Sequence, residues 1–211
     1  MENYTDKQIQ IITAAEELFA GKGFDGTSVR DIAQTANVNL AMISYYFGSK
    51  EKLLEAIFQY RIQSTFLQLE SLVNDSKKDP FQKIDTLVDH FTEKFFNNQC
   101  FYKLMQREQF KHLESSELEE IIYKSKKKNF DLISLLIAEG QKKGVFKKKI
   151  DVSLLASTMI GTSNQVFFSQ VFYKKVHELE AMPEDEFQAL LKKKVRQHLK
   201  TMLKAYLTNE A

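Results

Sequence analysis

Residues 27–53 have the sequence TSVRDIAQTANVNLAMISYYFGSKEKL, and this stretch decides how the N-terminal part of the chain folds. Ser28 and Asp31 have the spacing of a capping box, in which each side chain bonds the backbone amide of the other residue. The spacing predicts a helix that begins after Ser28 and runs to about Ala36. We expect a turn over residues 37–39, because asparagine tolerates turn conformations.

The same stretch contains two further helix starts. Asn39 is a good cap for a short helix over residues 40–47, and Gly48 ends this helix. Ser49 can cap a longer helix that continues to about Val73. The stretch therefore predicts a short helix, a tight turn, a second short helix and then a long one.

Another helix is predicted before this stretch. The glycine-rich segment 21–26 ends it, because glycine supplies the left-handed conformation of a helix C-terminus. Its apolar positions have helical spacing and are Ile9, Ile12, Leu18 and Phe19. The whole 211-residue chain contains only 2 Pro and 7 Gly, which favours a mostly helical structure.

Amphipathic helices are predicted over the rest of the chain. Asp79 is a cap that precedes a proline at the first helical position. A shorter helix contains Tyr102, Met105 and Phe110. Further helices are predicted over 116–140, 151–177 and 183–207. The sequence therefore predicts an all-α fold without internal repeats.

The three N-terminal helices have the lengths and turns of a helix-turn-helix, in which the third helix enters the DNA major groove. Its predicted inward residues are Val38, Ile43 and Phe47. Its predicted outward residues are Asn39, Leu40, Ala41, Met42, Ser44, Tyr45 and Tyr46. Tyrosine hydroxyls and a following lysine, Lys50, are natural phosphate partners. The alternative is that the tyrosines are core aromatics, and the flanking caps with Lys50 favour the DNA role.

Two segments, Thr27 through Ala33 with Val38 and Tyr45 through Leu53, resemble the N-terminal signature of the TetR family of one-component transcriptional regulators. The resemblance covers residues 9–58. It implies an N-terminal helix-turn-helix domain over 1–49 and a larger helical domain over 50–211 for ligand binding and dimerisation.

The resemblance also implies roles for individual residues. Thr27 or Ser28, Tyr45, Tyr46 and Lys50 match positions that commonly hold phosphates, and residues 39–45 match the helix that contacts bases. Family members are homodimers, and usually the free protein represses until a ligand releases it from a palindromic operator. The expected partners are therefore double-stranded operator DNA and a small effector.

Two features of the N-terminal module depart from a simple DNA-binding pattern. Residues 1–52 contain five bases and seven acids, although no acid lies between Ile32 and Lys50. In addition, Leu40, Ala41 and Met42 stand where many family members have a polar residue, Gly, and Thr or Ser. An apolar triplet favours contacts with thymine methyl groups over hydrogen bonds to bases.

The C-terminal helices contain more aromatic and methionine side chains than a compact bundle requires. These residues form either an ordinary core or the lining of an apolar cavity with a few polar groups. The cavity hypothesis predicts a small apolar effector bound by Phe66, His90, Phe91, Phe95, Tyr102, Met105, Gln106, Gln109, Phe130, Met159, Asn164 and Phe167.

The last two predicted helices have apolar faces that exceed the need of one chain, which predicts a two-fold homodimer through this pair. The chain has no apolar stretch long enough to span a bilayer and no signal-peptide pattern. A soluble, cytoplasmic protein without a membrane partner is therefore expected, and the single cysteine, Cys100, fits a reducing compartment.

Two other classes of protein remain open. No phosphate loop, catalytic triad or metal-ligand spacing is recognisable, so we expect no enzyme activity, metal or cofactor. A helical enzyme that acts on an apolar substrate is the first alternative. A helical interaction protein without DNA binding is the second, and the acidic balance of residues 1–52 supports it.

Overall fold

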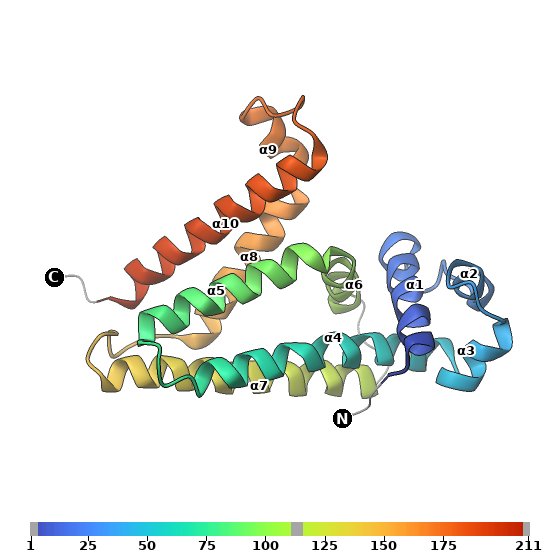
Figure 1. Cartoon of the computed structure of the whole chain (residues 1–211), viewed down its shortest axis with the longest axis horizontal. Helices are drawn as coiled ribbons and strands as arrows, with labels where there is room; N and C mark the ends of the chain where they lie inside the picture. The colour runs from blue at the N-terminus through green and yellow to red at the C-terminus, as the bar shows by residue number, and fades with distance from the viewer. Residues whose placement is uncertain (1–3, 111–115, 209–211) are drawn as a thin grey trace. The chain divides into compact units, whose positions relative to one another are not determined.

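The computed structural model describes residues 4–110 and 116–208, without the side chains of residues 64–67, 108–110 and 116. The described residues are all-helical and contain no strand, as the sequence predicts (Figure 1). The helices are α1 (Asp6–Lys22), α2 (Val29–Thr35), α3 (Leu40–Phe47), α4 (Lys50–Val73), α5 (Pro80–Asn97), α6 (Gln99–Phe110), α7 (Ser116–Lys142), α8 (Val152–Phe168), α9 (Gln170–Val176) and α10 (Glu184–Leu207).

The chain forms two compact units. The first comprises residues 1–67 and 98–127, and the second comprises residues 68–97 and 128–211. The first unit therefore contains the predicted DNA-binding module together with most of α4, all of α6 and the start of α7. Within the described ranges, no helix combines the length and the apolar character that crossing a membrane would require.

The predicted helix starts in the first unit are confirmed. The Ser28 hydroxyl accepts from the amide of Asp31 at 3.1 Å, and the Ser28 amide donates to the Asp31 carboxylate at 3.0 Å. Asn39 caps α3 through its side-chain oxygen, and the Ser49 hydroxyl caps α4. Because the helices begin where local sequence requires, the path of the chain through residues 27–50 is set by its own caps.

The turns between these helices require unusual backbone conformations. Gly23 and Gly48 end α1 and α3 with φ values of 84° and 78°, which glycine adopts without a steric penalty. Asn37, between α2 and α3, has a φ of 47°, and asparagine is among the few other residues that tolerate this region. The amide of Val38 then donates to the carbonyl of Ala33 at 3.0 Å, which closes the turn.

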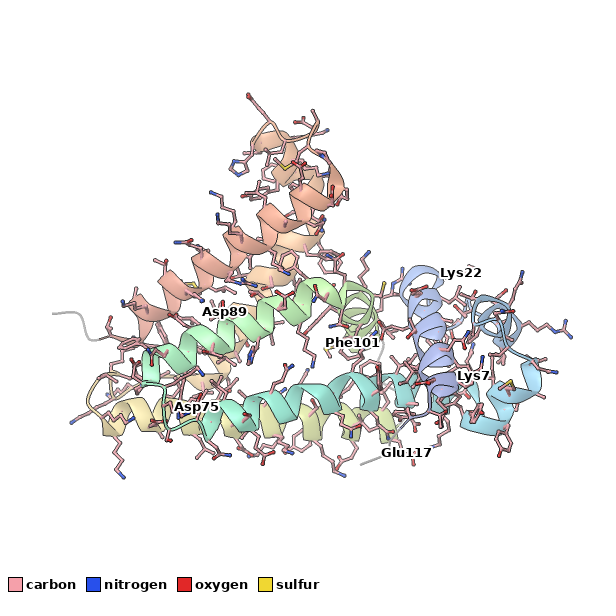
Figure 2. All side chains as sticks on the ribbon, viewed as in Figure 1. Lys7, Lys22, Asp75, Asp89, Phe101 and Glu117 are labelled. Atoms are coloured by element: carbon pink, nitrogen blue, oxygen red, sulfur yellow. The ribbon has the colours of Figure 1, made fainter. Side chains whose placement is uncertain are left out.

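One apolar core holds the first unit together. Phe101 of α6, labelled in Figure 2, packs against Phe58 of α4 with ring centroids 5.2 Å apart. Helix α6 also packs along α1. The fully buried members of this core include Ile11, Ile12, Phe19, Ile32, Ile43, Leu53, Ile57, Phe58 and Leu104.

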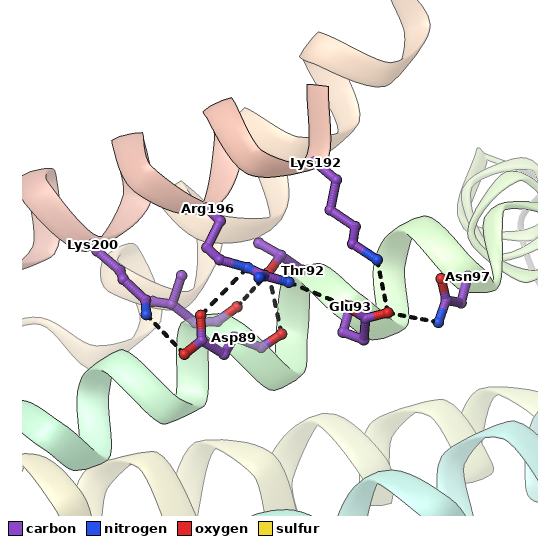
Figure 3. Close-up of polar contacts among 8 residues, drawn as sticks. Asp89, Thr92, Glu93, Asn97, Lys192, Arg196 and Lys200 are labelled. Carbon is purple, nitrogen blue, oxygen red and sulfur yellow. Dashed lines mark hydrogen bonds and ion pairs between the residues drawn. The ribbon is translucent and has the colours of Figure 1, made fainter. Parts of the chain in front are cut away.

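In the second unit, α10 packs along α5 and α8. Figure 3 shows the polar edge of the α5–α10 contact, where Asp89 and Glu93 face Lys192, Arg196 and Lys200 at donor–acceptor distances of 2.7 to 3.4 Å. Such partly exposed pairs each contribute about 1 kcal/mol or less. Five charges in one row nevertheless set the register between the two helices, because each cation has a carboxylate within reach.

The predicted single helix over 151–177 is wrong. The chain leaves helical geometry at Ser169, where φ is −100° and ψ is 22°, and α9 begins after it. The Ser169 hydroxyl donates to the carbonyl of Gln165 at 2.6 Å, and the Ser169 amide donates to the same oxygen. A serine that competes for backbone hydrogen bonds favours such a break, and no proline or glycine marks it in the sequence.

Most of the apolar face expected on α10 is used within the chain. The buried residues are Phe187, Leu191, Val195, Leu199, Leu203 and Leu207, whereas Leu190 and Met202 are half-buried and Tyr206 is 37% exposed. Further exposed apolar side chains of this region lie on α8 and α9, and they are Leu154, Ile160, Phe168, Val171, Phe172 and Val176. Helix α9 has no buried residue.

Candidate nucleic-acid interface

Helix α3 presents a continuous outward face. Tyr45 is 83% exposed and Leu40 is 41% exposed, which is unusual for such large side chains. Asn39, Ala41 and Ser44 are also exposed, whereas Met42 and Tyr46 are half-buried. The predicted inward residues behave as expected, since Ile43 is buried and Val38 and Phe47 are half-buried against the core. The exposed face of α3 therefore carries small polar and apolar side chains together with one tyrosine.

The two tyrosines differ in their surroundings. The Tyr46 ring packs against the rings of Tyr45 and Phe47, at centroid distances of 5.1 and 6.4 Å. Tyr46 also contacts the buried core of the unit. The core therefore holds the Tyr46 ring, and Tyr45, which packs against that ring, extends into solvent.

The hydroxyls of Thr27 and Ser28 both donate hydrogen bonds within the chain. Thr27 is 1% exposed, and its hydroxyl donates to the carbonyl of Gly23 at 2.8 Å. The prediction that the Thr27 side chain holds a phosphate therefore has no support in its geometry, because tertiary packing turns it inward. The Ser28 hydroxyl is exposed but donates to the Asp31 carboxylate at 2.8 Å. The Ser28 hydroxyl therefore stabilises the start of α2, and the Thr27 hydroxyl stabilises the segment that follows α1.

The N-terminus of α2 nevertheless keeps donors for an anion. The capping box uses the amides of Ser28 and Asp31, and the amides of Val29 and Arg30 have no intrahelical acceptor by their position. The Arg30 side chain on this turn is exposed. Arg30 was not among the predicted site residues, although a cation on the first turn of α2 was visible in the sequence. A helix start with an adjacent guanidinium is suited to phosphate.

Lys50 joins the start of α4 to the segment before α2. Its ammonium donates to the carbonyls of Phe24 and Thr27 at 3.0 and 3.1 Å, and it lies 4.2 Å from the centroid of the Phe24 ring. An ammonium has three donors, so one remains for a phosphate. The structure thus brings Lys50 to the N-terminal end of α2.

Comparisons with known proteins agree with this geometry. Residues 11–57 match the family model described as bacterial regulatory proteins, tetR family, and residues 80–199 match a tetracyclin repressor-like C-terminal domain. The chain belongs to the TetR family. It is a DNA-binding transcriptional regulator. The members of this family are regulators that respond to small effectors, and the family is not one of enzymes.

Individual TetR-family proteins are similar over most of their length. The chain is 30% identical over 174 residues to the probable HTH-type transcriptional regulator YttP of Bacillus subtilis, covering 80% of this chain and 83% of that protein. The structure of the fatty acid degradation regulator FadR from Bacillus halodurans has a TM-score of 0.69 at 26% identity, covering 94% and 97% of the two chains.

A third structure is that of FadR from Bacillus subtilis in complex with stearoyl-CoA. It has a TM-score of 0.67 at 22% identity and covers 92% of this chain and 97% of that one. At this identity the likeness shows the fold that the two proteins share.

The residues predicted to bind an effector are divided between the two units. In the second unit, the Phe95 ring lies 6.0 Å from the ring of Phe91 and 6.0 Å from that of Phe167. Met159 is buried on the same face of α8 as Phe167. Phe130 instead borders an open surface hollow with Tyr206 and residues 148–153, and His90 is exposed.

Two buried oxygens accompany the aromatic cluster. The Ser163 hydroxyl and the Asn164 side-chain oxygen, both on α8, have no hydrogen-bond partner within the described chain. Ser163 is 0% exposed and lies between Met159 and Phe167 on the inward face. Buried polar atoms without partners are rare in native proteins, and each requires an explanation.

The other predicted effector residues lie in the first unit. Tyr102, Met105 and Gln106 of α6 are half-buried, and burial raises the pKa of Tyr102 to about 12. The side chains of Phe66 and Gln109 lie outside the described residues. Cys100 is half-buried, and burial raises the pKa of its thiol. Within the described ranges, no cluster of three or more potential metal-binding side chains occurs.

The Lys50 ammonium predicts a measurable effect on stability. Lys50→Met leaves two carbonyls without their charged donor, so we expect the free energy of unfolding to fall by about 1–3 kcal/mol. Urea denaturation followed by circular dichroism measures this loss. Lys124→Met is the matched control, because Lys124 pairs with Glu120 of its own helix between two largely exposed side chains, so its loss should cost about 1 kcal/mol or less. Equal costs for the two variants would contradict the proposed role.

Proposed function

We propose that this chain is a cytoplasmic repressor that binds a pseudo-palindromic operator as a homodimer and leaves it when a long-chain acyl effector binds. The exposed face of α3, which projects Tyr45 from a buried support, is the observation that carries the DNA-binding part. One α3 from each protomer enters a major groove, and the half-site centres are about 34–36 Å apart or a multiple of this distance.

The base contacts follow from the residues on that face. Leu40, Ala41 and Met42 contact thymine methyl groups, which are the apolar feature of the major groove. The Asn39 side-chain oxygen already accepts the amide of Ala41 at 2.9 Å, so its NH2 group is the part available to DNA. Ser44 supplies a hydroxyl that can bond either a base or a phosphate.

The phosphate contacts come from both ends of the helix-turn-helix. The hydroxyls of Tyr45 and Tyr46 and the third donor of Lys50 bond the backbone of the duplex. At the start of α2, a phosphate is held by free amides, with Ser28 and Thr27 positioning them. Arg30 adds a charge that the sequence-based list lacked.

A gel shift with the DNA upstream of the protein's own coding region tests operator binding. Lys50→Ala should weaken binding to all sequences and lower the salt slope by about 1, because one phosphate contact is lost. Tyr45→Phe should weaken binding by about tenfold with little change in slope, since it removes a neutral donor to a charged acceptor. The binding of both variants is measured at a temperature below their unfolding midpoints.

Tyr123→Phe is the control for Tyr45→Phe, because Tyr123 is an exposed tyrosine on α7, outside the helix-turn-helix. It should leave the affinity unchanged. A wild-type protein that shifts no upstream DNA would favour the alternative of a helical interaction protein. Equal effects of the two tyrosine variants would remove Tyr45 from the interface.

The effector part of the proposal rests on the second unit. Phe91, Phe95 and Phe167 offer apolar contacts to an acyl chain, and the oxygens of Ser163 and Asn164 bond a polar group of the ligand such as the thioester region. The likeness to FadR proteins, one of them in complex with stearoyl-CoA, supports this class of ligand. The same ligand must bind the DNA-free conformation more tightly in order to release the operator.

Stearoyl-CoA should therefore raise the unfolding temperature and release the operator, whereas free coenzyme A should do neither. Asn164→Leu should leave the unliganded protein equally or more stable, because it removes a buried oxygen without a partner. It should also weaken stearoyl-CoA by about 2- to 12-fold through the lost hydrogen bond. Thermal shift and fluorescence titration measure the two effects, with the exposed Gln165→Leu as control. An unchanged stearoyl-CoA affinity in Asn164→Leu would contradict the assignment.

The dimer is proposed through α8 and the outward face of α10, with α9 extending the contact. The exposed apolar residues Ile160, Phe168 and Phe172 favour a partner surface, since monomeric proteins rarely leave large contiguous apolar patches in water. A seven-residue helix without buried residues, such as α9, also gains little stability alone.

Multi-angle light scattering should give about twice the 24.6 kDa chain mass for the wild type. Phe168→Glu combined with Phe172→Glu should give the monomer mass, because a buried unpaired carboxylate opposes association. Leu135→Glu, at an exposed leucine of α7, should remain dimeric. A monomeric wild type at micromolar concentration would overturn the proposed dimer.

A further inference from the structure

A buried carboxylate lies in the middle of the helix that supports the helix-turn-helix. Glu16 of α1 is 3% exposed, and its neighbours on the same helix include the buried Ile12, Ala15 and Phe19. Burial raises the pKa of Glu16, although the nearby Arg61 opposes this effect. A carboxylate at such a position is costly unless it is paired and hydrogen-bonded.

Arg61 of α4 is the partner of Glu16. Its Nε donates to one carboxylate oxygen at 2.7 Å, and its Nη2 donates to the other at 3.0 Å. Two parallel hydrogen bonds of this kind fix the orientation of a guanidinium as well as its distance. Helix α1 therefore has a defined rotation relative to α4.

The same guanidinium has a third donor that reaches another segment. Its Nη1 donates to the side-chain oxygen of Asn98 at 2.7 Å. Asn98 is the single residue between the end of α5 at Asn97 and the start of α6 at Gln99. Arg61 thus connects α1, α4 and the α5–α6 link through one planar group.

The α5–α6 link is covalently continuous with the proposed effector site. Phe95 of α5 precedes Asn98 by less than one helical turn, and Phe91 by about two turns. A shift or rotation at the end of α5 consequently changes the position of Asn98. Helix α6 follows at once, and its residues Phe101 and Leu104 belong to the core that also contains Ile11 and Phe19 of α1.

The energetics of buried ion pairs make a purely stabilising role a weak explanation. Apolar residues of similar volume often serve stability as well or better, whereas an ion pair with directional hydrogen bonds defines one geometry. A group that satisfies three segments only in one arrangement is suited to distinguish two conformations.

We propose that Asn98, Arg61 and Glu16 form a positioning relay that makes the orientation of α1 depend on the α5–α6 link. In the conformation described here the relay is closed, and this conformation is the one that binds DNA. The proposal rests on the proposed function, because it concerns how the same regulator is controlled. In this proposal none of the three residues contacts DNA.

Asn98→Ala tests the relay without removing the ion pair. We expect operator affinity to fall at least about fivefold, the low end of coupling between sites, with an unchanged salt slope because no phosphate contact is lost. Hydrogen exchange of the α1 amides should become faster. Asn98→Asp keeps an acceptor for the guanidinium and should restore the affinity to within about twofold. Asn97→Ala is the matched control, since the Asn97 side chain donates to Glu93 on its own helix.

A double-mutant cycle shows whether the effect passes through Arg61. Arg61→Lys keeps the positive charge beside Glu16 but loses the planar fork, so Asn98→Ala should have little further effect in that background. Additive effects would overturn the relay, and so would an Asn98→Ala variant with wild-type affinity and wild-type α1 exchange. A wild-type protein that binds no operator overturns the proposed function itself, whereas the other two outcomes overturn only the relay.

Discussion

The ammonium of Lys50 is the interaction on which the arrangement of the DNA-binding residues depends. It bonds the carbonyls of Phe24 and Thr27 in the segment before α2, and it belongs to the first turn of α4. Helix α3, which carries Tyr45, lies between α2 and α4 in the chain. The Lys50 ammonium therefore joins the segment before α2 to the helix that follows α3. The turns at Asn37 and Gly48 then determine how α3 is presented, because their positive φ values permit sharp changes of direction.

Local sequence predicted the helix starts well, and the physical reason is that caps act over three residues. Ser28, Asn39 and Ser49 need only the amides two or three residues after them, so the preference is contained in the local sequence. The break at Ser169 was missed because serine is common within helices, and only its hydroxyl geometry reveals the competition with Gln165.

Properties that depend on distant contacts were not accessible from the sequence. The inward position of Thr27 is set by the packing of the segment after α1, and nothing in its own residue type distinguishes it from Ser28. The apolar face of α10 matched a dimer interface in pattern, but α5 and α8 of the same chain pack against this helix and most of that face is buried. Arg61 bonds residues 45 and 37 positions away, a separation at which no periodicity signals a pair.

The acidic balance of residues 1–52 looked like evidence against DNA binding, and the structure shows why a charge count is a poor guide here. Glu16 is turned into the core and paired with Arg61, which lies beyond the counted segment. The pKa of Asp31 is lowered by hydrogen bonds from Ser28, and that of Glu51 by a hydrogen bond from Ser49, so these two carboxylates serve the starts of α2 and α4. A phosphate interacts with the charges and hydrogen-bond donors near it. The exposed outward residues of α3 from Leu40 to Tyr45 include no acid that would repel it. A module can therefore be net acidic and still present a surface that accepts DNA.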